Sequence, residues 1–449
     1  MDLHPPRILL INPWIHDFAA YDFWVRPMGL LQIAAILRKH GCSVKFLDCL
    51  DRFHPKGGHP GYLKDGRGPY RKTPIQKPEG LSDVPRTFSR YGIDPEWFEA
   101  DLAAAPRPDM VFVSSLMTYW YTGVKETIGM IKKAHPGVPV VLGGIYATLL
   151  PSHAAEHTGA DEVVTGPAEE AVFDLVKKYT GCVITPHIDL QDMNALPHPA
   201  FDLQPEIPYV TILTAKGCPN RCAYCASYIL QPKRMTRHPQ NVADEIAHWH
   251  VRFGVTNFAF YDDALLVDAE NHAIPLLEAL AGFREHLSFH TPNAIHVRPV
   301  TQKIAKLLYE TGFQNIRLGV ETTDFTGKNF DGKVFREEFV HAARLLLEAG
   351  FDRDQVGAYL LVGLPGQDPG EVEKSIDEVK KCGITPVPAY YTPIPHTRMW
   401  EAACAASRYD IKNEPLFTNN ALMPCMPAFD PDWLTGLKRR IAFAKNKNR

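Results

Sequence analysis

The sequence lacks the features that mark exported and membrane-inserted proteins. No segment approaches the ~20 consecutive apolar residues that a membrane-spanning helix requires. The N-terminal residues contain neither a basic region nor a long apolar run, which argues against export. A net charge of −3 over 449 residues gives no electrostatic reason to bind nucleic acid or an anionic membrane. We therefore expect a soluble, cytoplasmic protein with no nucleic-acid or membrane partner.

Disulfide bonds are not expected either. The chain has 9 cysteines and no secretory signal, so free or metal-bound thiols in a reducing cytosol are the better interpretation. Hydrophobic residues make up 45% of the chain and charged residues 22%, as in ordinary globular enzymes. A chain of this length suits about two to three domains with sizeable cores.

Three of the cysteines form a compact motif. Cys218, Cys222 and Cys225 stand in a Cys-x₃-Cys-x₂-Cys run with no fourth cysteine nearby. A [4Fe–4S] cluster is normally held by four thiolates, so three in one loop leave one iron open to substrate. The alternative is structural zinc, completed by His238 or a distant cysteine, but such sites usually consist of two separated ligand pairs. We interpret the motif as a catalytic cluster site.

The first part of the chain alternates short apolar segments with amphipathic ones. Over residues 5–180 this pattern predicts an α/β, doubly wound (Rossmann-like) domain with a five-stranded parallel sheet, whose ligands bind at the carboxyl ends of the strands. The predicted strands are 7–12, 44–49, 110–115, 138–142 and 162–164, and the predicted helices are 27–40, 124–134 and 168–178.

One long segment interrupts this pattern. Residues 52–108 are rich in proline, glycine, lysine and arginine and have few periodic apolar positions. An insertion of this length is usually either a functional lid or disordered, and the sequence favours neither. A proline-rich linker, residues 181–208, follows the domain.

Strand-then-helix units follow the linker. The predicted strands are 209–215, 257–262, 287–290, 315–320, 356–361 and 387–391, and the predicted helices are 242–253, 274–283, 303–310, 336–348 and 371–381. These units are too few for a closed barrel, so residues 209–400 predict a partial (β/α)6 TIM-type barrel with its chemistry at the carboxyl ends of the strands. The cysteine motif follows the first strand. Residues 401–449 form a C-terminal extension with a basic helix over 437–445, which we expect to cap the barrel.

The cysteine motif resembles the signature of radical S-adenosylmethionine (SAM) enzymes. The resemblance extends over most of the chain, and it implies that the open iron binds SAM, which one electron cleaves to a 5′-deoxyadenosyl radical. Polar residues at later strand ends match positions where the family contacts SAM, with paired aspartates in place of the common Gly-Gly-Glu. His396 replaces the glycine of a common Pro-Gly-Thr stretch. The implied SAM-binding residues are Tyr224, Asp262, Asp263, Asn293, Arg298 and Glu321, with Arg298 near the methionyl carboxylate.

The N-terminal domain resembles the cobalamin (B12)-binding domain that precedes the barrel in a subgroup of these enzymes. The implied cobalamin-binding residues are Ser114, Ser115, Gly143, Gly144, Thr165 and Gly166. No Asp-x-His-x-x-Gly motif occurs in residues 1–180, so the resemblance implies a cobalt without a histidine ligand. The aromatic run at 117–121 has two interpretations, a face toward the corrin or the substrate and ordinary core packing.

The resemblance implies an enzyme that uses a [4Fe–4S] cluster, SAM and cobalamin, with an electron donor such as flavodoxin or ferredoxin. The leading interpretation is methylation of an unactivated carbon of an unidentified substrate. The alternative is a radical rearrangement or ring closure, with or without cobalamin. A non-catalytic cobalamin or iron–sulfur sensor is disfavoured by the intact motif. A methylthiotransferase is disfavoured because Cys42, Cys49 and Cys182 lack convincing spacing for a second cluster.

Overall fold

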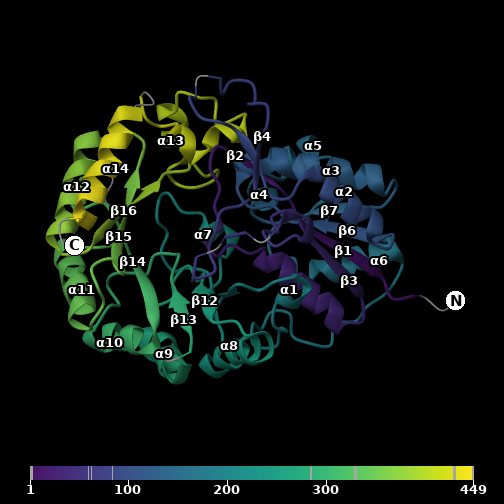
Figure 1. The fold of residues 1–449 in the computed structure, drawn as a ribbon, viewed down its shortest axis with the longest axis horizontal. Coiled ribbons are helices and arrows are strands. Elements are labelled where there is room, and N and C mark those ends of the chain that lie inside the picture. Colours follow the sequence, from purple (N-terminus) through teal and green to yellow (C-terminus); the bar gives the residue numbers. More distant parts are fainter. Residues whose placement is uncertain are drawn as a thin grey trace. The chain divides into compact units, whose positions relative to one another are not determined.

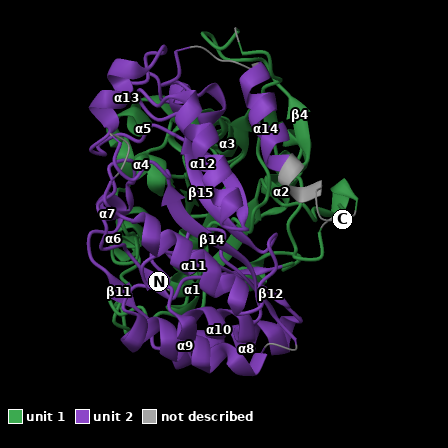
Figure 2. Ribbon diagram, turned by 90° about the vertical axis from the view of Figure 1, so that its left-hand side faces the viewer, with its two compact units in different colours: residues 1–208 green, residues 209–449 purple. Residues whose placement is uncertain are grey.

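The computed structural model describes residues 4–58, 60–61, 63–82, 84–283, 286–327, 331–427 and 431–446. The chain divides into two compact units, residues 1–208 and 209–449 (Figure 2). The division falls at the end of the proline-rich segment that separates the two strand–helix patterns in the sequence.

A five-stranded parallel sheet forms the centre of unit 1 (Figure 1). Its strands lie in the order β3 (Ser43–Asp48), β1 (Arg7–Asn12), β6 (Met110–Val113), β7 (Val140–Leu142) and β8 (Glu162–Val163). The helices of the unit are α1 (Met28–Lys39), α2 (Pro95–Ala104), α3 (Tyr121–Ala134), α4 (Ile145–Leu149), α5 (Pro151–His157) and α6 (Ala171–Thr180). The central strands are buried along their length, which explains their continuous apolar runs. The predicted doubly wound domain is confirmed.

The order of strands reverses between β1 and β6. The chain passes from β1 to β3 on one side, then returns to add β6, β7 and β8 on the other. Sheets of this kind bind ligands outside the carboxyl ends of the strands at such a reversal. Here the Ser114 hydroxyl donates to Asn12 Oδ1 (3.2 Å), and the Asn12 amide donates to Asp48 (2.8 Å). Polar side chains thus join the carboxyl ends of the three strands nearest the reversal.

The segment 52–108 contains regular structure in its described residues, which exclude 59, 62 and 83. β4 (Lys72–Pro74) and β5 (Ser89–Tyr91) form an antiparallel sheet with β2 (Ile15–Asp17), in the order β2-β5-β4. Helix α2 then leads into β6. Disorder, one of the two alternatives, is wrong for these residues. The sequence pattern does not predict the antiparallel sheet.

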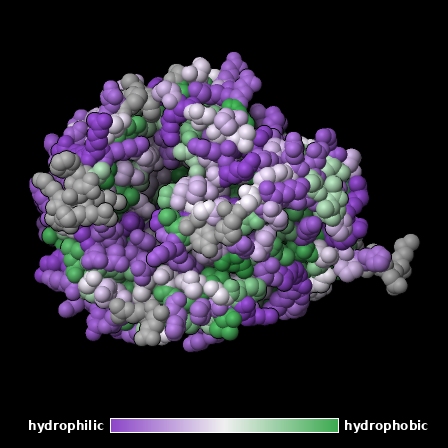
Figure 3. Space-filling model, viewed as in Figure 1, coloured by the Kyte–Doolittle hydropathy of each residue, from purple (hydrophilic) through white to green (hydrophobic). Residues whose placement is uncertain are grey.

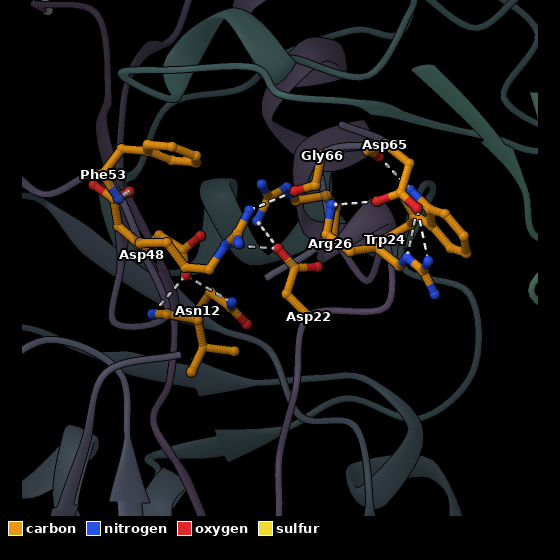
Figure 4. A network of polar contacts seen from close by, with 12 residues as sticks. Asn12, Asp22, Trp24, Arg26, Asp48, Phe53, Asp65 and Gly66 are labelled. Atoms are coloured by element: carbon orange, nitrogen blue, oxygen red, sulfur yellow. Dashed lines mark hydrogen bonds and ion pairs between the residues drawn. The ribbon is translucent and has the colours of Figure 1, made fainter. Parts of the chain in front are cut away.

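A buried network of charges holds this segment against the loop that follows β2 (Figure 4). The fully buried Asp22 carboxylate lies 3.1 Å from Arg52 Nε and 3.7 Å from a guanidinium nitrogen of Arg26. Arg52 also donates to the Gly66 carbonyl at 2.6 Å. Removing one partner of a buried ion pair leaves an uncompensated charge, so the network tolerates little change.

A six-stranded parallel sheet forms the centre of unit 2 (Figure 1). Its strands lie in the order β16 (Thr385–Tyr390), β15 (Val356–Val362), β14 (Phe313–Glu321), β13 (Ser288–His290), β12 (Asn257–Phe260) and β9 (Val210–Ile212). The intervening helices are α8 (Pro239–Phe253), α9 (Ile274–Leu280), α10 (Gln302–Thr311), α11 (Arg336–Glu348) and α12 (Pro369–Lys381). Sequential strands pair in parallel throughout. The predicted partial barrel is confirmed.

Shorter elements complete both units. In unit 2 these are β10 (Ala215–Lys216), α7 (Ser227–Leu230), β11 (Met235–Thr236), a π-helix (Ala269–Ala273), α13 (Trp400–Ala406), α14 (Pro431–Asn446) and 3₁₀ turns at Ala281–Phe283, Pro415–Thr418 and Asn420–Leu422. In unit 1 they are 3₁₀ turns at Pro55–Gly57, Thr118–Trp120 and Phe201–Leu203.

The predicted basic C-terminal helix is part of α14. Arg440 of this helix pairs with Glu373 (2.9 Å) and Asp377 (2.5 Å) of α12. The helix also contacts β16, so it packs beside the last barrel strand.

Hydrophilic side chains cover much of the surface visible in Figure 3, and apolar ones are scattered between them. Within the described part of the chain, no helix is both long enough and apolar enough to cross a membrane.

Replacing Arg52 by Met tests the buried network. The variant leaves the Asp22 carboxylate without its nearest cation, so we expect the free energy of unfolding to fall by about 3 kcal/mol. As a control, Arg38→Met removes a partly exposed guanidinium that pairs with Asp202, and we expect little change. Chemical denaturation followed by circular dichroism measures both variants. Equal losses would contradict the role assigned to Arg52.

Candidate active site

The cysteine motif lies in a loop beyond the carboxyl end of the first barrel strand. After β9 the chain forms β10, which pairs with β11, and the motif lies between these two short strands. Gly217 enters the loop with φ of +82°, and a Cβ there would lie 2.7 Å from the carbonyl oxygen of Lys233. Glycine is the residue that meets both conditions without strain. This close approach fixes where the cysteine loop begins.

The three thiols are largely shielded from water. Cys222 is buried, and Cys218 and Cys225 are partly buried. Burial raises the pKa of the Cys218 thiol above its usual range and that of the Cys222 thiol to about 11. The backbone N–H of Ser227 donates to Cys225 Sγ at 3.4 Å. Binding of iron deprotonates a coordinating thiol outright, so burial does not prevent these residues from acting as ligands.

The arrangement of these thiols fits an iron–sulfur cluster. In the described part of the chain, no three Cys, His, Asp or Glu side chains converge on a single metal ion. A [4Fe–4S] cluster does not require such convergence, because each thiolate binds a different iron. His296 is a neighbour that the sequence did not suggest, with Nε2 3.8 Å from Cys218 Sγ. Burial lowers the pKa of His296 to about 4, so its imidazole is neutral near pH 7.

Two later loops fasten the cysteine loop. Asp331 accepts a hydrogen bond from the backbone N–H of Ala223 (2.9 Å) and pairs with Arg398 (3.2 Å). Arg398 also donates to the carbonyl of Arg221, and the N–H of Met399 donates to the carbonyl of Ala223 (2.9 Å). The stretch in which His396 departs from the family pattern therefore holds the backbone between the cysteines.

Tyr224 and Glu321, both predicted to contact SAM, lie together. The Tyr224 hydroxyl donates to Glu321 Oε1 at 2.7 Å, and Lys333 Nζ lies 2.6 Å from the same oxygen. Glu321 ends β14 with φ of +68°, an uncommon conformation for a non-glycine residue. No sequence motif marks Lys333, which lies in a loop without periodicity. The one available signal is Gly319, since a glycine inside a strand often marks a close approach.

Asp262 is fully enclosed at the end of β12. Its Oδ1 accepts hydrogen bonds from the N–H of Thr214 (3.0 Å), the hydroxyl of Thr214 (2.6 Å) and the N–H of Ala215 (2.6 Å). Oδ2 is buried and has no hydrogen-bond partner among the described residues. Burial raises the pKa of Asp262 to about 6 against these hydrogen bonds. One oxygen thus joins the first two barrel strands, whereas the other is buried without a hydrogen-bond partner among the described residues.

Asp263 and Asn293 lie beside this carboxylate. Burial raises the pKa of Asp263, which interacts with Ser227 and Arg234. The Asn293 amide donates to the carbonyls of Tyr261 (2.9 Å) and Asp262 (3.3 Å), so it joins the ends of β12 and β13. The structure therefore brings both residues to the edge that carries the cysteine loop.

Arg298 differs from the other predicted SAM-binding residues. Its side chain is 56% exposed, and its guanidinium pairs with Glu338 at 2.8 Å at the start of α11. It also lies over the ring of Phe335. These partners belong to the outer helical layer, so the structure does not bring Arg298 to the cysteine loop. A surface ion pair satisfies the guanidinium that the sequence suggested for the methionyl carboxylate.

The predicted cobalamin-binding residues follow three adjacent strands of unit 1, and their positions meet at one edge of the sheet. Ser114 and Ser115 follow β6, Gly143 and Gly144 follow β7, and Thr165 and Gly166 follow β8. The Ser115 hydroxyl donates to the Gly143 carbonyl at 2.7 Å, so this serine shapes the turn. No protein atom lies within 4 Å of a Cβ built on Gly166. This open backbone fits the approach of a flat macrocycle or its tail.

Neither the aromatic run nor His54 adds an obvious cobalt or corrin contact. His54 lies 3.1 Å from Asp101 and stacks on Trp97, so its side chain is engaged within the unit. Tyr119 and Tyr121 are buried, and the Trp120 indole donates to Asp17 at 2.6 Å. Core packing is therefore the better interpretation of the run, although Met117 is exposed.

Comparisons with known proteins agree with both halves of this description. The family model described as the radical SAM superfamily matches residues 212–379, and the model of the B12 binding domain matches residues 90–176. The chain is thus a radical SAM enzyme with a B12-binding domain ahead of its barrel. The [4Fe–4S] cluster, SAM and cobalamin are the cofactors that these domains imply.

Relatives and a solved structure extend the comparison. The uncharacterized methyltransferase PH0819 of Pyrococcus horikoshii is 26% identical over 66% of this chain and 70% of its own length. Cytidylyl-2-hydroxyethylphosphonate methyltransferase of Streptomyces wedmorensis is 21% identical over 84% of this chain and 78% of its own. The radical SAM methyltransferase TsrM of Kitasatospora setae, solved with cobalamin and a [4Fe–4S] cluster, superimposes with a TM-score of 0.65 at 17% identity, covering 90% of this chain and 79% of that one. At this identity the last likeness shows the fold alone.

Replacing Gly217 by Ala tests the start of the cysteine loop. The new Cβ would lie 2.7 Å from the Lys233 carbonyl at a positive φ, so the loop must shift and we expect the variant to retain much less iron after anaerobic reconstitution. Gly436→Ala in α14 is the control, because nothing lies within 4 Å of its Cβ. Iron and sulfide analysis measures both. Full cluster loading in the Gly217 variant would contradict the assignment.

Replacing Asp262 by Asn tests the raised pKa of this carboxyl. The ordinary pKa of the carboxyl is 3.8, and its pKa in the folded protein is about 6. Between these pH values the folded state therefore binds more protons than the unfolded state. The free energy of unfolding therefore falls as the pH rises from about 4 to about 6. Asparagine keeps an acceptor for the three donors but does not ionise, so this part of the decline, up to about 3 kcal/mol, should disappear.

Denaturation of the metal-free protein across this pH range measures the effect. Asp244→Asn on α8 is the control, since that carboxylate is exposed and bonds only to Gln240 among its described contacts. An unchanged pH dependence in the Asp262 variant would show that the buried carboxyl titrates at its ordinary value.

Proposed function

We propose that this protein methylates an unactivated carbon of its substrate by radical chemistry. The observation that carries the proposal is the cysteine loop at the carboxyl edge of a radical SAM barrel, in the same chain as a B12-binding domain. Two relatives that match most of this chain are named methyltransferases, which favours methyl transfer over other radical reactions. When bound, the cluster supplies the electron that cleaves SAM to a 5′-deoxyadenosyl radical, and cobalamin carries the methyl group.

The residues of the chain hold and orient these groups. Cys218, Cys222 and Cys225 would bind three irons of a [4Fe–4S] cluster, and this motif offers no fourth cysteine. Asp262 and Asp263 offer carboxylates to the SAM ammonium. Their burial strengthens such contacts, since charges interact more strongly away from water.

Tyr224 and Glu321 border the same edge of the barrel. The predicted residues of unit 1 offer a backbone edge to cobalamin.

The electron donor and the compartment are part of this proposal. A flavodoxin or a ferredoxin suits a one-electron delivery to an iron–sulfur cluster. The cytoplasm suits a chain whose thiols must stay reduced to bind iron.

Cys222→Ala tests the cluster assignment. Losing one of three thiolates should abolish cluster-dependent cleavage of SAM, so we expect no 5′-deoxyadenosine above background. Cys382→Ala is the control, because this partly buried cysteine caps α12 away from the motif. Chromatography of anaerobic reactions with reconstituted protein measures the product, and spectra with and without SAM report on the open iron. Product formation by the Cys222 variant would refute the cluster assignment.

Transfer of the SAM methyl group onto bound cobalamin separates methyl transfer from a radical rearrangement or ring closure. We expect the purified protein to bind methylcobalamin and to pass label from methyl-labelled SAM onto it. A protein that forms 5′-deoxyadenosine without retaining cobalamin would support a rearrangement or ring closure instead of methyl transfer.

A further inference from the structure

Lys333 places a positive charge inside the candidate active site. The side chains of Lys333 and Glu321 are 15% and 14% exposed, and Nζ lies 2.6 Å from Glu321 Oε1. The Tyr224 hydroxyl donates to the same oxygen and also interacts with the Cys222 thiol. The Lys333 ammonium and the Tyr224 phenol therefore meet at one carboxylate, and Tyr224 belongs to the cysteine motif itself.

The Lys333 ammonium lies in the space left by a glycine of β14. A Cβ on Gly319 would lie 2.8 Å from Lys333 Nζ and 3.2 Å from Ala294 Cβ. Any other residue at this point of β14 would meet the ammonium or push it away. β14 therefore has no side chain at the point where the Lys333 ammonium lies. A glycine inside a strand is uncommon and often marks such a close approach.

The charges around Lys333 include the cluster ligands. Glu321 raises the pKa of Lys333 against the effect of its burial, and Cys222 and Cys218 act in the same direction. In the opposite sense, Lys333 favours the thiolate form of Cys222, whose pKa burial raises. Glu321 acts on both Lys333 and Cys222, and Asp331 also acts against the Cys222 thiolate, so one cation and two carboxylates set the charge beside this thiol.

We propose that Lys333 is a positioning residue that makes the cluster easier to reduce, because its buried ammonium offsets the negative charge of the cysteine ligands. This inference rests on the proposed function, since it assumes a cluster on Cys218, Cys222 and Cys225. Reduction adds one electron from the donor to the cluster with no bond made or broken. A fixed positive charge nearby stabilises the more negative, reduced state. Glu321 acts with the opposite sign and also holds the ammonium in place.

Two substitutions of opposite sign test the inference. Lys333→Met removes the positive charge while keeping a long apolar stem, and Glu321→Gln removes the negative charge while keeping an acceptor for Tyr224. At a fixed potential we expect the ratio of reduced to oxidised cluster to fall at least tenfold in the first variant, a shift of about 59 mV for one electron. In the second variant we expect the ratio to rise.

The measurement is a dithionite titration of the reconstituted full-length protein without SAM, followed by electron paramagnetic resonance. Lys333→Arg keeps the charge and should return the ratio to within threefold of the wild type. Lys306→Met removes an exposed ammonium of α10 that pairs with Glu310, and should leave the ratio unchanged. Gly319→Ala should shift the ratio in the direction of Lys333→Met, which gives a second route if that variant assembles little cluster.

The outcomes separate this inference from the proposed function. A charge effect is supported if the ratio of reduced to oxidised cluster falls in Lys333→Met, rises in Glu321→Gln and recovers in Lys333→Arg. Shifts of the same sign, or no shift in either variant, would overturn it, since a purely structural role does not follow the sign of the charge. If the wild-type protein formed no SAM-responsive cluster, the proposed function itself would fail. If that cluster formed and its reduction potential were the same in the Lys333 variants as in the wild type, only the present inference would fail.

Discussion

Both units depend on one constraint, which is that parallel strands present their carboxyl ends at a common edge. In unit 2 this edge carries the cysteine loop after β9, Asp262 after β12, Asn293 after β13 and Glu321 at the end of β14. Residues more than 100 positions apart in the sequence are therefore brought close together at this edge. In unit 1 the same rule joins Asn12, Asp48 and Ser114 at the reversal of strand order. The order of the parallel strands therefore determines which residues reach the edge where the functional site lies.

Within unit 2, polar side chains convert this edge into a defined site. Asp331, Arg398 and Met399 hold the backbone of the loop between the cysteines by hydrogen bonds. Asp262 performs the same task from the other side by binding the backbone of Thr214 and Ala215. A loop fastened at both ends keeps its thiols in place before iron arrives. Binding then costs less conformational entropy than ordering a free loop would.

The sequence predicted the fold well, because the signals that define it are local. Buried parallel strands are short apolar runs, and the helices between them show the expected periodicity. The antiparallel sheet β2-β5-β4 was missed because its strands have three residues each, and β4 is fully exposed, so no apolar alternation marks it. Its strands have partners that are distant in the sequence, such as Arg90 of β5 with Glu126 of α3, and pairs of this kind leave no local pattern.

The site shows the same division between local and distant signals. The three cysteines and Tyr224 form a contiguous motif, and Asp262 and Glu321 follow recognisable strands. The guanidinium of Arg298 suits the methionyl carboxylate, but in the structure it pairs with Glu338 of α11. Lys333, in contrast, has no motif, and its importance comes from the space that Gly319 leaves and from the carboxylate 12 positions earlier. Sequence reasoning identifies which residue types belong at a site, whereas competition among partners decides which of them reach it.

The two oxygens of Asp262 illustrate how structure and function are combined in one residue. Three donors satisfy Oδ1, which accounts for the role of the carboxylate in joining the first two strands. An asparagine or a threonine would serve that role without the cost of a buried charge. Oδ2 has no partner among the described residues, and a buried unpaired carboxylate oxygen destabilises the folded protein. A cationic ligand at this oxygen would offset that cost, and this is the physical basis for proposing Asp262 as a partner of the SAM ammonium.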